Sequence, residues 1–217
     1  MTGIQTYSEQ IAQHIKGALL SGELAPGQKI NEVNLANKLG ISRAPVREAL
    51  QLMVNDGLVV SIPQRGKFVR SLTPQEIRDN YELGGVLEGA VVAKSSLLLT
   101  EADFARLEDV ITQMQAIAPG AHYAAEYARL DQFFHELLTT KQCNQACYEL
   151  GRKTCQRISK FLLFRHWPHA FTHTEYVARH KEVLEAVRTH DGWRIESVIR
   201  QHYSSLGERM APFGVES

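Results

Sequence analysis

The spacing of apolar residues predicts three helices near the start of the chain. The first covers residues 7–20, where apolar residues recur at the three- and four-residue intervals of one helical face. Asn31 can cap a second, shorter helix that ends at Gly40. Ser42 can cap the third helix, which Gly57 closes. The inward face of this third helix is expected to contain Val46, Ala49, Leu50 and Met53.

After Gly57 the helical pattern is replaced by short apolar runs. The segments LVVSI, PQRG and KFVR, residues 58–70, indicate strand, turn and strand in succession. Helix, short helix, tight turn, helix and hairpin together form the order of a winged helix-turn-helix. Thr73 and Glu76 then match the capping box of a new helix. We therefore expect two domains, residues 1–72 and 73–217.

The second domain has helical periodicity throughout and no strand alternation, which predicts an antiparallel helical bundle. The fold class is therefore mainly α, with an N-terminal winged helix-turn-helix and a C-terminal all-α bundle. The histidine-rich stretch RHWPHAFTH, residues 165–173, is expected to be a loop or a break. The expected helices of the bundle are 74–98, 101–117, 122–140, 144–165, 174–190 and 193–209.

Basic residues are concentrated where a winged helix-turn-helix meets DNA. Residues 1–70 carry eight lysines and arginines against five acidic residues, whereas the rest carries 16 against 19. Arg43 and Arg47 are i, i+4 neighbours, and an arginine can bind guanine or phosphate with two parallel hydrogen bonds. Taken singly, each basic residue is an ordinary solvent-exposed side chain. The arrangement predicts a DNA interface formed by Ser42, Arg43, Arg47, Arg65, Gly66 and Lys67.

Ionisable residues interrupt the apolar faces of three helices in the second domain. Asp131 and His135 lie four residues apart on one face, and His180 and His202 lie on two others. A buried carboxylate or imidazole must be paired or bound to something, and this donor set suits Zn, Ni, Mn or Fe. The alternative is a set of unrelated core histidines with local hydrogen-bond partners. We favour a divalent metal site, which in octahedral geometry leaves two positions for water or a carboxylate.

Composition excludes several other classes of protein. No run of about 18 apolar residues is present, so no membrane span is expected, and the N-terminus has no secretory signal. Cys143, Cys147 and Cys155 are too few for a disulfide scaffold, which favours a cytoplasmic protein. The first two could bind metal or act in redox chemistry, but small core residues are the favoured interpretation. No evident general base lies beside the four metal candidates, so we predict that the chain is not an enzyme.

Two regions of the chain resemble a known family. LANKLGISRAPVREALQLMVNDGLVVSIPQRGKFV resembles the winged helix-turn-helix of GntR-type bacterial regulators. YELGGVLEGAVVAKSS, DQFFHELL, RHKEVLEAVRTHD and RQHY resemble the FadR-like ligand-binding (FCD) branch. The resemblance implies a homodimer that binds an inverted-repeat DNA operator, and a helical domain that holds a metal with a small carboxylate effector. It places the family's metal ligands on Asp131, His135, His180 and His202, and DNA contacts on Arg43, Arg47 and the wing around Gly66.

One stretch departs from that branch. An arginine usually precedes the Leu-Glu pair of the first C-terminal helix, where it can meet an effector carboxylate, but here Gly84 and Gly85 lie in that neighbourhood. Two glycines are expected to open space and remove a positive charge, so the effector differs or another cation binds it. Arg157 and Lys160 are the candidates.

We predict a ligand-responsive repressor that its effector releases from DNA. The alternatives are a constitutive DNA-binding dimer with a structural metal, and a metal-dependent enzyme acting on a small acid.

Overall fold

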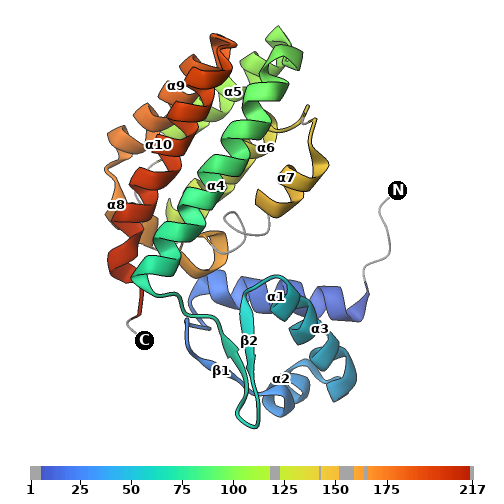
Figure 1. Ribbon diagram of the computed structural model, residues 1–217. Helices are drawn as coiled ribbons and strands as arrows, with labels where there is room; N and C mark the ends of the chain where they lie inside the picture. Colours follow the sequence, from blue (N-terminus) through green and yellow to red (C-terminus); the bar gives the residue numbers. More distant parts are fainter. Residues whose placement is uncertain (1–5, 118–122, 142, 152–158, 164–165, 216–217) are drawn as a thin grey trace. The chain divides into compact units, whose positions relative to one another are not determined.

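The computed structural model describes residues 6–117, 123–141, 143–151, 159–163 and 166–215 (Figure 1). The chain forms two compact units that divide between Leu72 and Thr73, and a short stretch ending at Leu162 groups with the first unit. No helix among the described residues is long and apolar enough to cross a membrane.

The first unit is a winged helix-turn-helix, as predicted. The third helix buries Val46, Ala49, Leu50 and Met53 completely. A third strand, not expected from the sequence, pairs antiparallel with the hairpin to give the sheet order β1-β3-β2. The elements are α1 (Tyr7–Ser21), β1 (Lys29–Ile30), α2 (Glu32–Leu39), α3 (Arg43–Asn55), β2 (Val59–Ile62) and β3 (Gly66–Val69).

Ser42 occupies the predicted N-cap position of α3, but its side chain makes no capping hydrogen bond. The four threonine N-caps of the structure each accept from the backbone N–H three residues later. In α3 that third residue is Pro45, which has no N–H. The proline therefore fixes the first turn and leaves the exposed Ser42 hydroxyl without a capping partner.

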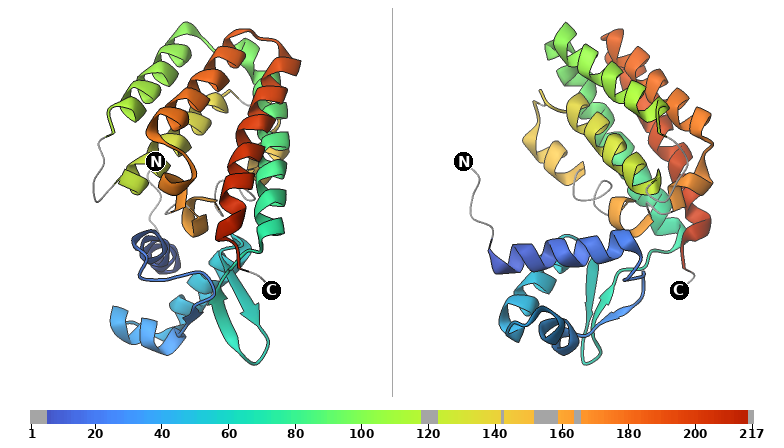
Figure 2. Two further views of the ribbon diagram at one scale, coloured as in Figure 1. Left: turned by 90° about the vertical axis from the view of Figure 1, so that its left-hand side faces the viewer. Right: turned by 180° about the vertical axis from the view of Figure 1, so that it is seen from behind.

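The second unit is all-helical among the described residues, which confirms the predicted bundle (Figure 2). Threonine or aspartate caps begin α4, α5, α9 and α10. Short 3-10 turns follow α4 and α10. The helices are α4 (Pro74–Ser95), α5 (Glu101–Gln115), α6 (Tyr123–Leu138), α7 (Gln145–Gly151), α8 (Trp167–Ala170), α9 (His173–Arg188) and α10 (Gly192–Met210).

Two expectations for the segment between α6 and α9 need correction. In place of one helix over 144–165, α7 ends at Gly151 and a π-helical segment covers Ser159–Leu163, while residues 152–158 lie outside the described part of the chain. The stretch 165–173, expected to be a loop or a break, contains the short helix α8, in which Pro168 occupies one of the first two positions. Proline is tolerated there because the first helical N–H groups have no acceptor within the helix.

Helices α4 and α10 lie side by side and share the most extensive interface of the second unit (Figures 1 and 2). Glycines allow this close approach. A Cβ atom on Gly85 would lie 2.9 Å from the Cβ of Tyr203, and one on Gly207 would lie 2.9 Å from the Cβ of Tyr81. The expected open space at the glycine pair is therefore wrong for Gly85, because α10 fills it.

Gly85→Ala should destabilise the second unit by about 1–2 kcal/mol. Alanine gains about 1 kcal/mol of helix propensity, but overpacking between two helix backbones costs about 1–3 kcal/mol or more. Gly192→Ala is the matched control on the same interface, because its Cβ would meet the Cβ of Ala93 at an ordinary 3.7 Å. Urea unfolding followed by circular dichroism measures both variants. A Gly85→Ala protein at least as stable as the wild type would show that overpacking costs no more than the roughly 1 kcal/mol that alanine gains in helix propensity.

Candidate functional site

The four predicted metal ligands come together in the second unit. One ligand atom from each of Asp131, His135, His180 and His202 lies within 4.8 Å of the others. We call these residues the Asp-His cluster. Asp131 and His135 share a face of α6, and α9 and α10 supply one histidine each. The three histidines are buried and Asp131 is partly buried.

A buried carboxylate behind the Asp-His cluster orients His135. The Nδ1–H of His135 donates to Glu88 Oε1 at 2.5 Å, and the hydroxyl of Tyr203 donates to Glu88 Oε2 at 2.8 Å. Glu88 is on α4 and is only 6% exposed. A carboxylate that accepts from Nδ1–H directs the Nε2 lone pair of the imidazole toward the cluster. This role of Glu88 was not predicted from the sequence, although a glutamate among apolar residues and glycines of one helix is a signal for it.

The hydrogen bond that His180 makes with the backbone turns its other ring nitrogen toward Asp131. Its Nδ1–H donates to the backbone carbonyl of Tyr176 at 2.8 Å, so Nε2 carries a lone pair in the neutral ring. That nitrogen lies 3.2 Å from Asp131 Oδ1, and His135 Nε2 lies 3.9 Å from the same oxygen. His202 Nδ1 is buried without a hydrogen-bond partner among the described residues. Converging lone pairs and an orphaned buried nitrogen form a donor set that a cation satisfies.

Without a metal, the protonation states of the Asp-His cluster follow from burial and from neighbouring charges. Burial opposes a charge on His135, but the charge and hydrogen bond of Glu88, with the charge of Asp131, raise its pKa to about 9. Burial and the neighbouring charges of His180 and Arg179 hold the pKa of His202 well below its ordinary value. Burial would raise the pKa of Asp131, yet the hydrogen bond with His180 and the histidine charges lower it. Asp131 is therefore a carboxylate and His202 a neutral imidazole.

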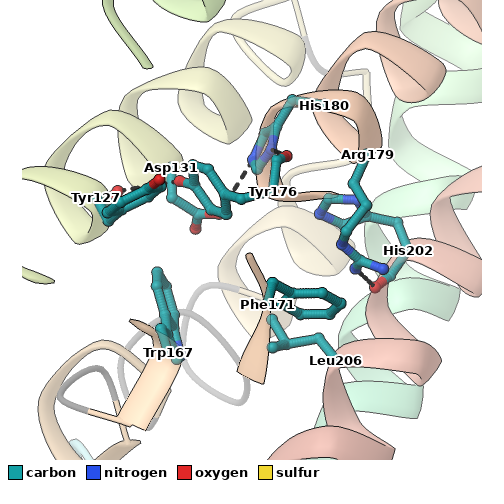
Figure 3. Close-up of a pocket in the computed structure, with 9 residues that line it drawn as sticks. All are labelled: Tyr127, Asp131, Trp167, Phe171, Tyr176, Arg179, His180, His202 and Leu206. Carbon is teal, nitrogen blue, oxygen red and sulfur yellow. Dashed lines mark hydrogen bonds and ion pairs between the residues drawn. The ribbon is translucent and has the colours of Figure 1, made fainter. Parts of the chain in front are cut away.

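A pocket of about 410 Å³ opens beside the Asp-His cluster (Figure 3). One side is aromatic and apolar, while residues of the Asp-His cluster and the guanidinium of Arg179 provide the charged groups. The pocket is lined by Tyr127, Asp131, Trp167, Phe171, Tyr176, Arg179, His180, His202 and Leu206. Arg179 was not among the site residues predicted from the sequence, although it directly precedes His180 on α9.

Other expectations for this unit have different outcomes. Arg157 lies outside the described residues, as does the side chain of Lys160, so their expected effector contacts stay predictions. Gly84 lines a second pocket of about 270 Å³, so space does exist at the first glycine of the pair.

The expectation that Cys143 and Cys147 are core residues is wrong. The Cys143 thiol is exposed and the Cys147 thiol is partly exposed, and both are free. Cys143 follows α6 and Cys147 lies early in the short helix α7. Cys155 lies outside the described residues.

In the first unit, three basic side chains gather around one carboxylate. Glu32 Oε2 lies 3.6 Å from Arg47 Nε and 3.9 Å from Arg43 Nη2, and Glu32 Oε1 lies 3.3 Å from Lys67 Nζ. Both arginines are mostly exposed, whereas the Lys67 side chain is only 11% exposed. The predicted interface residues of α3 and β3 are thus linked through the first turn of α2.

At the tip of the wing, backbone freedom and an aromatic side chain set the shape. Gly66 has φ +104°, a conformation that side chains with a Cβ rarely adopt. Arg65 lies over the ring of Phe68, with its Cζ 5.9 Å from the ring centroid. The tip therefore presents the exposed Arg65 beside a glycine, whose backbone is not covered by a side chain.

Each of the two units matches a known protein family. Residues 7–69 match the family described as bacterial regulatory proteins, gntR family, and residues 79–205 match the FCD domain. Over 204 residues the chain is 24% identical to the HTH-type transcriptional repressor RspR of Escherichia coli K12, covering 94% of this chain and 89% of that protein. It is 32% identical over 148 residues to the Nta operon transcriptional regulator of Aminobacter aminovorans, covering 68% of each.

A solved structure has the same fold. A GntR transcriptional regulator from Rhodococcus sp. RHA1 aligns with a TM-score of 0.72 at 21% identity, covering 95% of this chain and 98% of that one. The family resemblance found in the sequence is confirmed. The chain therefore belongs to the GntR family of bacterial regulatory proteins and is a DNA-binding transcriptional regulator with an FCD domain.

Proposed function

We propose that the protein is a transcriptional repressor that a small organic acid releases from DNA. In this proposal residues 1–72 bind an inverted-repeat operator in the cytoplasm, and residues 73–217 form the homodimer and bind a divalent metal and the effector. The observation that carries the proposal is the Asp-His cluster, whose donor atoms converge beside a pocket in the regulatory domain. The name of RspR, a repressor, supports the sign of the regulation.

The chemistry of the Asp-His cluster fits a divalent metal. One carboxylate and three imidazoles suit Zn, Ni, Mn or Fe. Hydrogen bonds to Glu88 and to the Tyr176 carbonyl engage the Nδ1–H groups of His135 and His180, so each offers Nε2. Such an ion, held by these four residues, would supply Lewis acidity toward an effector oxygen.

The proposed DNA interface contains Ser42, Arg43, Arg47, Arg65, Gly66 and Lys67. The Ser42 hydroxyl is exposed and makes no capping bond, so it is available to a phosphate oxygen. Arg43 and Arg47 lie in the N-terminal half of α3, the part of a recognition helix that reaches base edges in the major groove. Glu32 holds both guanidinium groups near one point before DNA arrives.

Arg47→Ala should weaken binding to an operator selected from random DNA by about 1–3 kcal/mol. It should also relax the base preference at one position, because a bidentate contact to guanine is lost. Fluorescence anisotropy at one fixed salt concentration measures the affinity, since phosphate contacts make it salt-dependent. Arg129→Ala is the control, because it removes a similarly exposed arginine, paired with Glu126 at 2.7 Å, from the second unit. Unchanged affinity of the Arg47 variant would remove Arg47 from the readout.

His180→Ala should abolish the binding of about one metal ion per chain. Elemental analysis and native mass spectrometry of one sample report the metal content and whether the protein is a dimer. His14→Ala, which removes an exposed histidine of α1, should keep the full metal content. Full metal retention in the His180 variant would exclude His180 as a ligand.

Glu88→Gln should keep the metal stoichiometry but lower the metal affinity about 10–100-fold. The neutral amide no longer strengthens the basicity of His135, and groups that orient metal ligands typically contribute effects of this size. Competition with a chromophoric chelator gives the affinity. Wild-type affinity in this variant would show that Glu88 serves packing alone.

A further inference from the structure

Arg179 provides the cation of the pocket beside the Asp-His cluster. Its Nη1–H donates to Ser205 Oγ at 2.5 Å, and its Nη2–H donates to the backbone carbonyl of His202. Burial lowers its pKa to about 10, so it stays positively charged at neutral pH. A guanidinium has five N–H groups, and these two bonds leave others for a ligand.

No ion pair joins Arg179 to a carboxylate in the part of the chain that the structure describes. The neighbouring Arg209 differs, because its Nη1–H donates to the carbonyl of Ala170 at 2.8 Å and its Nη2 pairs with Glu175 Oε1 at 3.2 Å. Both arginines stack on Phe171, each with its Cζ 4.2 Å from the ring centroid. Arg179 therefore has a fixed plane and position. The charge of Asp131 acts on it, but no described carboxylate pairs with it directly, so its free N–H groups suit recognition of an anion.

The remaining walls of the pocket suit a flat ring. Tyr127, Tyr176, Trp167 and Leu206 supply aromatic and apolar surface. The indole of Trp167 is only 8% exposed, and its Nε1–H has no acceptor among the described residues. Figure 3 shows Trp167 on one side of the pocket and Arg179 on the other. A ligand between them meets an aromatic surface at one end and a guanidinium at the other.

We propose that the effector is an aromatic carboxylate, with its carboxylate on Arg179 and its ring against Trp167, Phe171 and Tyr127. This inference rests on the proposed function, because it names the effector class of the same pocket.

Trp167 provides a local optical probe of this pocket. The chain contains two tryptophans, and the other, Trp193, is 82% exposed at the start of α10. Trp193→Phe therefore leaves one emitting indole, which lines the pocket. The titrations use this full-length protein with one equivalent of zinc. Benzoate should change the emission saturably, whereas benzamide, which lacks the charge, and acetate, which lacks the ring, should bind at least tenfold more weakly.

Arg179→Gln in the same background should weaken benzoate binding about 10–100-fold, because a hydrogen bond between charged groups is lost. Arg179→Lys keeps the charge without the planar fork and should recover part of the affinity. Arg188→Gln is the matched control, since Arg188 also lies on α9 and over an aromatic ring, that of Phe104 at 4.7 Å, but does not line the pocket. It should bind benzoate like its parent protein.

The outcomes separate the effector class from the function it rests on. Equal binding of benzoate and benzamide, or wild-type affinity in both Arg179 variants, would overturn carboxylate recognition by Arg179. No binding of benzoate to a protein that still binds zinc and operator DNA would overturn the aromatic class and leave the proposed function standing. Failure of the parent protein to bind zinc or DNA would instead overturn the proposed function. Circular dichroism of each variant excludes misfolding as the cause of lost binding.

Discussion

The buried carboxylate of Glu88 is the interaction on which the second unit depends. It lies on α4, accepts from His135 on α6 and accepts from Tyr203 on α10, so a single side chain links three helices. A buried charge is costly unless it is fully paired, and here both oxygens have donors. Gly85, three residues earlier, lets α10 approach closely enough for Tyr203 to pack against α4. The packing of α4 against α10 and the orientation of His135 in the Asp-His cluster therefore depend on the same side chain, Glu88.

The parts of the fold that follow from local periodicity could be predicted. Helical spacing of apolar residues identified α3 and most helices of the bundle, and the polar interruptions of three apolar faces identified Asp131, His135, His180 and His202. Interactions between distant segments could not be predicted in this way. Glu88 meets His135 across 47 residues of sequence, and Arg179 meets Ser205 across 26, so no local pattern marks either partner.

Two other predictions, the capping bond of Ser42 and the open space at Gly85, failed because a neighbouring residue or helix changed what the residue type normally does. Ser42 is a favourable N-cap by type, but Pro45 removes the N–H that the threonine caps of this chain use. Gly85 suggested open space because glycine has no side chain, yet the backbone of α10 occupies that volume. In both cases a neighbouring residue or helix overrides the preference of the residue type: Pro45 for the cap at Ser42, and α10 for the space at Gly85.

Glu32 gives the proposed DNA interface of the first unit a fixed anion. It lies near Arg43 and Arg47 and forms an ion pair with Lys67. Part of the positive charge of these side chains is therefore neutralised by a residue of the protein itself and not by dissolved ions. If these residues contact DNA as proposed, association with DNA is an exchange of anions, in which phosphates or base edges displace the carboxylate or share its partners. Unlike a dissolved counterion, Glu32 is tethered to α2 and cannot diffuse away, so its repulsion of phosphate persists in the complex. Nonspecific DNA offers phosphates but no matching base edges. Its binding would be weakened by this repulsion with no base contact to offset it.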